Sequence, residues 1–202
     1  MWRSSLLFLF AVILSGVSAS KTGLTTEGIV LPDVRHINGV ELIRNGHGVR
    51  SIPFLGMNVK VYVAGLYSNS PLRSDEDVMA CTDSPIQMDF TFLRSVGRNR
   101  VISAWTQQLE HSVSYRYDGY EEDRDAFINM FASPIDYKGT QTVQIDGDNT
   151  VIIHQGTQKG VIRGRDFQRA FLSMWFGEQA VSEDLKTGLL DGTNHRHHVS
   201  MA

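Results

Sequence analysis

The amino-acid sequence predicts an α+β fold, with several antiparallel strands and a smaller number of helices in separate parts of the chain. Apolar side chains alternate with a period of two in residues 58–67, 86–92 and 140–154, which is the pattern of β-strands. They recur at helical spacing within residues 99–133 and again from 166 to 177. At 202 residues and 42% hydrophobic content, the chain is long enough for one domain with a real core.

Residues 1–19 have the features of a cleavable secretory signal peptide. Arg3 supplies the positive charge, residues 6–14 (LLFLFAVIL) form a short apolar core, and Val17-Ser18-Ala19 is a small-residue cleavage site. The apolar run is short for a membrane span, although an uncleaved anchor is the alternative. Cleavage after Ala19 predicts a secreted or periplasmic protein of 183 residues, since 202 − 19 = 183.

Charge, cysteine content and histidine spacing limit the partners, disulfides and metal sites that the sequence predicts. The formal net charge of −3 gives no electrostatic reason to expect nucleic acid or an anionic lipid surface as a partner. Cys81 is the only cysteine, so no internal disulfide can form and the fold must rest on its core. The tail carries His195, His197 and His198 without spaced acids, which favours incidental binding over a metal site. The sequence therefore predicts no metal and no cofactor.

The stretch 46–67 (GHGVRSIPFLGMNVKVYVAGLY) organises the rest of the chain. We interpret Gly46-His47-Gly48 as a turn, and Pro53 with Gly56 as a tight break. Residues 58–67 follow as a strand, and both of its faces are largely apolar. A strand of that kind is typically central and covered on both sides.

The segments around this stretch are predicted from local pattern. Residues 20–36 are polar and are assigned to an N-terminal arm, and residues 40–43 to a first short strand. Residues 68–84 form a loop, with a helical turn at 75–79. Residues 86–92 alternate as a half-buried strand.

The second half of the chain is predicted as helices followed by a meander. Two helices cover residues 99–109 and 121–133, the second ended by Pro134. Three strands follow at 140–145, 150–154 and 160–163, with a turn at 146–149. Asp166 is the expected N-cap of a long helix that Gly177 ends, and Ser182 starts a short last helix. The polar tail 192–202 is predicted to be disordered.

Two polar groups stand out in the central stretch. Arg50 is flanked by Val49 and Ile52, and Tyr62 places a phenol on an apolar strand face. An antiparallel return between the two segments would bring guanidinium and phenol to one pocket, where they suit a carboxylate or an enolate. The alternative is that Arg50 pairs with an acid, such as Glu41 or Asp89, and that Tyr62 packs in the core.

Three blocks of the sequence resemble the chalcone isomerase fold family, over roughly residues 37–190. They are GVR with Gly56 and VKVYVAGLY, FTFLRSVGRNRVISAWTQQL at 90–109, and FQRAFLSMWFGEQAVSEDL at 167–185. The resemblance implies a domain over residues 37–191, built as a large antiparallel sheet covered by a layer of helices. It also implies a ligand cleft between the two layers, lined by the strand around Tyr62, the helix after Arg98 and the helix through Trp175.

The resemblance identifies ligand-binding residues but no catalytic set. The isomerases' arginine matches Arg50, whereas their other polar positions fall on Tyr62 and near Gly97, Ala104 and Met174. An arginine with a nearby strand tyrosine is more similar to the fatty-acid-binding branch of the family. We therefore expect a monomeric, non-catalytic protein that binds a small apolar anion such as a fatty acid through Arg50, Tyr62, Met174 and Trp175. The alternative is an isomerase, an intramolecular lyase acting on an unsaturated phenolic or oxo substrate.

Overall fold

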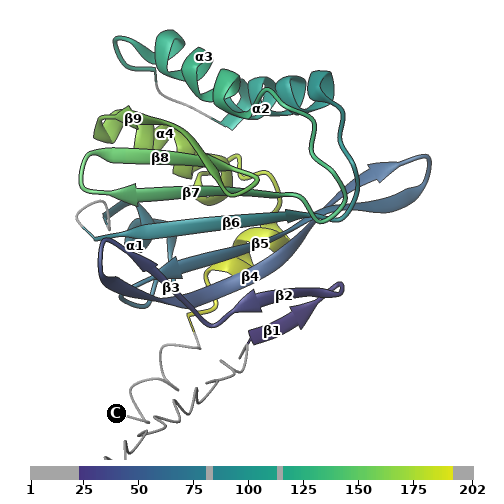
Figure 1. Cartoon of the computed structure of the whole chain (residues 1–202), viewed down its shortest axis with the longest axis horizontal. Coiled ribbons are helices and arrows are strands. Elements are labelled where there is room, and N and C mark those ends of the chain that lie inside the picture. The colour runs from purple at the N-terminus through teal and green to yellow at the C-terminus, as the bar shows by residue number, and fades with distance from the viewer. Residues whose placement is uncertain (1–22, 81–83, 113–115, 193–202) are drawn as a thin grey trace, which may run out of the picture.

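A curled, seven-stranded antiparallel sheet forms the centre of the molecule in the computed structural model, which describes residues 23–80, 84–112 and 116–192 (Figure 1). Every strand in the order β3-β4-β5-β6-β7-β8-β9 pairs with its neighbour in sequence. The strands are β3 (Val34–Ile37), β4 (Val40–Phe54), β5 (Met57–Ser68), β6 (Ile86–Phe92), β7 (Thr140–Asp146), β8 (Asn149–His154) and β9 (Thr157–Arg163). A separate hairpin consists of β1 (Gly23–Thr26) and β2 (Ile29–Pro32). The predicted α+β class is confirmed.

Five helices complete the described part of the chain, and they leave the sheet face toward the viewer in Figure 1 without a helical layer. They are α1 (Asp75–Ala80), α2 (Arg98–Ser112), α3 (Tyr120–Phe131), α4 (Arg165–Phe176) and α5 (Glu183–Leu189). The predicted helices and the predicted meander are confirmed, with boundaries moved by a few residues. Ser182 caps α5 as expected, since its hydroxyl accepts a hydrogen bond from the backbone N–H of Leu185.

The largest correction concerns the start of β4. Residues 40–43 were predicted as a short strand and Gly46-His47-Gly48 as a turn, but all of them belong to one strand of 15 residues. The glycines serve a different purpose, because α5 crosses the strand here. A Cβ at Gly46 would collide with the backbone oxygens of Gly188 and Leu189, and one at Gly48 would lie 2.8 Å from the Leu185 side chain. Glycine therefore permits close packing of a helix on the sheet.

Residues 20–36 were predicted as an N-terminal arm, but from residue 23 onward they contain β1, β2 and all of β3 except its last residue. Ile29 and Leu31 on β2 are buried and pack against Val63 of β5. The alternation of IVLP was the signal for this strand, but four residues in a polar segment are too few to stand out.

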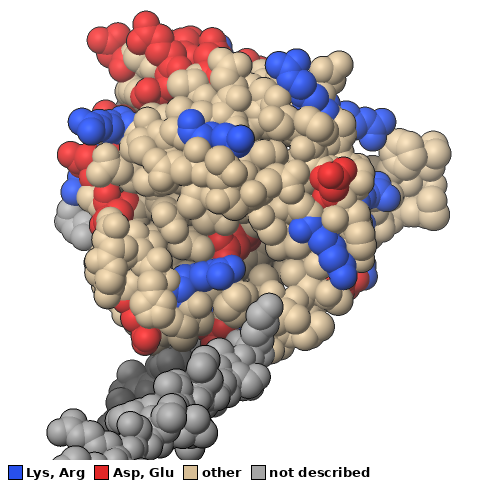
Figure 2. All heavy atoms as spheres, in the orientation of Figure 1, with Lys and Arg blue, Asp and Glu red and all other residues tan. Residues whose placement is uncertain are grey.

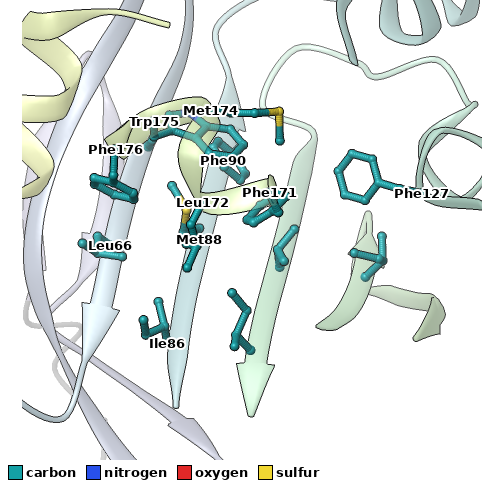
Figure 3. Close-up of a cluster of buried hydrophobic side chains, with 14 of the residues drawn as sticks. Leu66, Ile86, Met88, Phe90, Phe127, Phe171, Leu172, Met174, Trp175 and Phe176 are labelled. Atoms are coloured by element: carbon teal, nitrogen blue, oxygen red, sulfur yellow. The ribbon is translucent and has the colours of Figure 1, made fainter. Parts of the chain in front are cut away.

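Apolar residues of the sheet and of α4 form the main core (Figure 3). Trp175 of α4 lies beside Phe90 of β6 in this view, with their ring centres 5.2 Å apart. The predicted N-cap at Asp166 is wrong, because the helix begins at Arg165 after Gly164. Gly164 has a φ of 107°, a conformation that glycine adopts readily and that turns the chain from β9 into the helix.

Strand β6 is buried on both faces, not on one as its alternation predicted. Met88 and Phe90 point toward the helical layer and join the core. On the other face, Gln87 and Asp89 are also buried, in a polar network with Arg35. The polar residues of this alternating strand were expected to face solvent. Here Gln87 and Asp89 are buried, and hydrogen bonds to other side chains take the place of those to water.

Candidate ligand-binding site

A cavity of about 810 Å³ lies between one end of the sheet, α2 and the C-terminal end of α4. This volume is within the range of small-molecule sites in proteins. Its lining is mostly apolar and aromatic, with one arginine and one tyrosine on the sheet side. The lining residues are Arg50, Ile52, Val61, Tyr62, Phe92, Val96, Val101, Ala104, Trp105, Gln107, Gln108, Glu110, His111, Trp175 and Val181.

The register of the β4–β5 hairpin brings the two polar wall residues together. Arg50 on β4 is the direct partner of Tyr62 on β5, so both side chains leave the same face of the sheet. Tyr62 in turn pairs with Phe92 on β6. A bulge at Val61 follows, where the register moves from Arg50–Tyr62 to Ser51–Lys60. Bulges bend a strand locally, and Val61 also lines the cavity.

Arg50 has no carboxylate partner among the residues that the structure describes. One of its guanidinium N–H groups donates to the backbone oxygen of Ser51 at 2.6 Å. The two acids proposed from the sequence are engaged elsewhere: Glu41 lies 3.8 Å from His36, and Asp89 binds Arg35 at 2.6 Å. The half-buried guanidinium therefore offers several donors to the cavity.

Tyr62 is positioned by aromatic neighbours and by Trp175. Its ring packs edge-on against Phe90 and lies 5.7 Å from the ring of Phe92, centre to centre. The Trp175 indole N–H donates to the phenolic oxygen at 3.3 Å. Burial raises the pKa of Tyr62, partly offset by the Trp175 hydrogen bond and the Arg50 charge. The phenol is thus neutral at pH 7, and no described residue accepts its proton, so it can donate to a ligand.

Helix α2 forms the wall opposite the sheet. Val101, Ala104, Trp105 and His111 follow one another at helical spacing and all line the cavity. Trp105 stacks on Phe131 and contacts Trp175 edge-on, which anchors the apolar part of this wall. The polar end of the helix, with Gln107, Gln108 and Glu110, forms part of the rim. This amphipathic wall suits a ligand with one apolar and one polar end.

Three of the four residues predicted to bind ligand meet at this cavity, and one does not. Arg50, Tyr62 and Trp175 all line it. Met174 does not line it; its side chain is fully buried in the core. Successive helical residues are rotated by about 100°, so Met174 points away from the direction that Trp175 takes.

The resemblance implied that the helix after Arg98 lines the cleft, and α2 does so, but sequence reasoning did not identify which of its residues face the cavity. Trp105 was interpreted as a core residue, and the polar residues 107–111 were not considered as lining. Their helical spacing with Val101 was visible, but a polar extension of an apolar stripe is usually a solvated face. The cavity between α2 and the sheet becomes evident only from the three-dimensional arrangement of the two elements.

Other kinds of site find no support in the described ranges 23–80, 84–112 and 116–192. These residues contain no group of three or more His, Cys, Asp or Glu arranged to hold a metal ion. None of their helices is long and apolar enough to cross a bilayer. Cys81, the tail histidines and the predicted signal peptide lie outside the described residues.

A family model described as chalcone isomerase-like matches residues 23–191. The chain belongs to the chalcone isomerase-like family. The match begins in the segment that we predicted as an arm, consistent with the strands found there. The resemblance seen in the sequence is therefore confirmed, together with its sheet-and-helix architecture.

A solved structure supports the same fold. The fatty-acid binding protein AtFAP1 of Arabidopsis thaliana superposes with a TM-score of 0.65 at 16% sequence identity. The alignment covers 86% of this chain and 97% of the plant protein. No curated protein sequence matches this chain.

Proposed function

We propose that this protein is an exported, non-catalytic binder of a fatty acid or a similar amphiphile. Arg50 and Tyr62 hold the ligand's carboxylate, and the apolar walls around Trp105 and Trp175 receive its alkyl chain. The observation that carries the proposal is a cavity-facing arginine that has no acid partner in the described part of the chain and lies directly opposite a neutral tyrosine. A half-buried cation is costly unless an anion accompanies it. The family match and the structural similarity to a plant fatty-acid binding protein support this choice.

Titration calorimetry with saturated fatty acids of increasing length tests the proposal. Each methylene buried in the cavity contributes roughly 0.8 kcal/mol, so affinity increases with chain length until the cavity is full. A charged hydrogen bond contributes about 1.5–3 kcal/mol, so Arg50→Ala weakens binding about 10- to 100-fold. The control is Arg163→Ala, which removes an exposed arginine of β9 outside the cavity. Equal weakening by both variants, or no weakening by Arg50→Ala, contradicts the proposal.

We also propose that flavonoid chemistry is absent. Among the positions where the isomerases carry polar groups, Ala104 lines the cavity with a methyl group and Met174 lies in the core. Stabilising the charge that develops in such an isomerisation needs placed polar groups. Naringenin chalcone should therefore close only at its spontaneous rate when the protein is added. An enzyme-dependent rate that Arg50→Ala abolishes would establish the isomerase alternative instead.

Export and a monomeric state complete the proposal. Cleavage after Ala19 would leave Ser20 as the first residue of the mature protein. N-terminal sequencing of the protein from the extracellular or periplasmic fraction tests this, and an intact Met1 there contradicts it. Sedimentation of the same material measures the mass of the particle and therefore tests the monomer.

A further inference from the structure

The β4–β5 hairpin extends past the end of the sheet. Pairing between β5 and β6 stops at Tyr62 and Phe92, whereas β4 and β5 remain paired as far as Phe54 and Met57. The last residues of the hairpin therefore form a two-stranded ribbon. It projects to the right in Figure 1, and the same region in Figure 2 is a knob without charged atoms at its end.

The side chains of this ribbon become more exposed toward its apex, and they are apolar. The exposed fraction is 38% for Ile52, 57% for Phe54, 83% for Leu55 and 63% for Met57. No residue from Ser51 to Val59 carries a charge. A continuous exposed apolar surface of this kind marks an interaction site more often than scattered apolar residues do.

The turn at the apex differs from similar turns of this molecule in its first residue, which is apolar. Within residues 23–80, 84–112 and 116–192, four two-residue turns join adjacent strands with both residues at positive φ: Glu27-Gly28, Asn38-Gly39, Leu55-Gly56 and Gln155-Gly156. Three of them place a polar residue first, as expected in a solvated turn, while the fourth has Leu55 at φ 48°. Leucine is unfavourable here both for the backbone and for hydration. A partner that removes the side chain from water would account for it.

The apolar apex is continuous with the cavity. Ile52 is exposed on the ribbon and also lines the cavity, two residues from Arg50. A ligand that entered beside Ile52 would pass from the surroundings of the apex to the Arg50–Tyr62 pair.

We propose that the 52–57 apex inserts into the interfacial region of a phospholipid bilayer, and that the cavity exchanges its ligand with the bilayer at this point. The second half of this statement rests on the proposed function; the insertion itself does not. A bilayer fits better than a protein groove because exposure is greatest at the convex end of the ribbon, with no flat face for a partner to cover. Aromatic and aliphatic side chains without charges are those that enter the boundary between headgroups and acyl chains.

A fluorescent probe attached at the apex tests insertion of the apex itself, separately from any effect of the apolar residues 6–14. In a Cys81→Ser background, the environment-sensitive dye NBD is attached at Leu55→Cys, and phosphatidylcholine vesicles are added. The matched control is Asn38→Cys, which has the same positive-φ turn geometry at the opposite end of β4. We expect the emission to shift to shorter wavelength and to be quenched by spin-labelled lipid at position 55 only. No shift at position 55, or an equal shift at position 38, overturns the proposal.

A second measurement separates docking from ligand binding. Leu55→Asp should slow the transfer of a fluorescent fatty acid from vesicles to the protein about tenfold, the order expected for loss of one buried leucine. Its affinity for the same fatty acid without vesicles should equal that of the unsubstituted protein, because Leu55 does not line the cavity. Reduced affinity without vesicles would assign the apex to the binding site and overturn the docking role. If Arg50→Ala leaves affinity unchanged but the NBD shift persists, the proposed function fails while insertion stands.

Discussion

Strand β5 carries two tyrosines on opposite faces of the sheet, and each lies near an arginine. Among the described residues, only one of these two arginines forms an ion pair with an acid. On the face without helices, the Arg35 guanidinium lies 5.5 Å from the centre of the Tyr67 ring and binds Asp89 at 2.6 Å. On the cavity face, Arg50 lies opposite Tyr62 and forms no ion pair with a carboxylate of the described residues. The same pair of residue types belongs to an ion-paired network in one place and to an open candidate site in the other.

Both carboxylate oxygens of Asp89 accept hydrogen bonds from neighbouring side chains. One carboxylate oxygen accepts from Arg35, and the other accepts from Gln87 and Thr142, each at 2.8 Å. Burial raises the pKa of the Tyr67 phenol, as it does for Tyr62. Arg50 has no such carboxylate partner among the described residues, and a fatty acid would supply one.

The largest effect is expected on stability, from Asp89→Ala. It leaves Arg35, Gln87 and Thr142 without their acceptor, which should cost about 2 kcal/mol because Arg35 is partly hydrated. Arg50→Ala in the absence of ligand should change the free energy of unfolding by less than about 0.5 kcal/mol. Urea denaturation measures both. A comparable loss for Arg50→Ala would mean that Arg50 is structural as well.

An internal acid should close the open site. Ile52→Glu places a carboxylate two residues from Arg50, on the same face of β4 and in the cavity lining. It should compete with the ligand's carboxylate and weaken fatty-acid binding about tenfold, the equivalent of one charged hydrogen bond. Ile52→Gln has the same shape without the charge and serves as the control. Equal effects of the two variants in calorimetry would show that shape, not charge, was responsible.

Removal of the phenol should have a smaller effect. Tyr62→Phe deletes one neutral hydroxyl, with an expected loss of about 1 kcal/mol in binding free energy. Tyr67→Phe, on the other face of the same strand, should leave affinity unchanged. If both variants weaken binding alike, the hydroxyl of Tyr62 does not contact the ligand.

The smallest effect is expected from alkaline pH. A raised pKa means that Tyr62 stays protonated past the usual tyrosine value of about 10, so it remains a donor. Affinity for a fatty acid should therefore be constant from about pH 7 to about pH 10. A decrease that begins below pH 10 in the unsubstituted protein, but not in Tyr62→Phe, would show that the phenol ionises earlier.

Local patterns in the sequence were sufficient for most of the fold. Strand β5, the meander β7–β9 and helices α2 to α4 follow from periodicity and turn residues. The same signals failed where a residue type has two uses. Gly46 and Gly48 resemble a turn but allow α5 to approach β4, and Asp89 resembles a solvated residue but is buried with partners. Both depend on contacts between segments distant in sequence, which periodicity does not contain.

The candidate site was predictable in part for the same reason. The break expected at Pro53 and Gly56 predicted an antiparallel return from Arg50 to Tyr62, and the structure has this pairing, although the turn is at Leu55-Gly56 and Pro53 is still part of β4. Met174 and Trp175 are adjacent on α4, and only the packing of the helix decides that Trp175 reaches the cavity. The resemblance implied that the helix after Arg98 lines the cleft, but which residues of α2 face the cavity depends on how that helix packs.

The central claim is that Arg50 binds the carboxylate of an apolar ligand, and a four-way comparison tests it most directly. Palmitate and its methyl ester are titrated into the unsubstituted protein and into Arg50→Ala by calorimetry. We expect the acid to bind the unsubstituted protein about 10- to 100-fold more tightly than the ester does, since a charged hydrogen bond contributes about 1.5–3 kcal/mol. Arg50→Ala should bind acid and ester with equal affinity. If the unsubstituted protein also binds them equally, no carboxylate is held by Arg50 and the account is wrong.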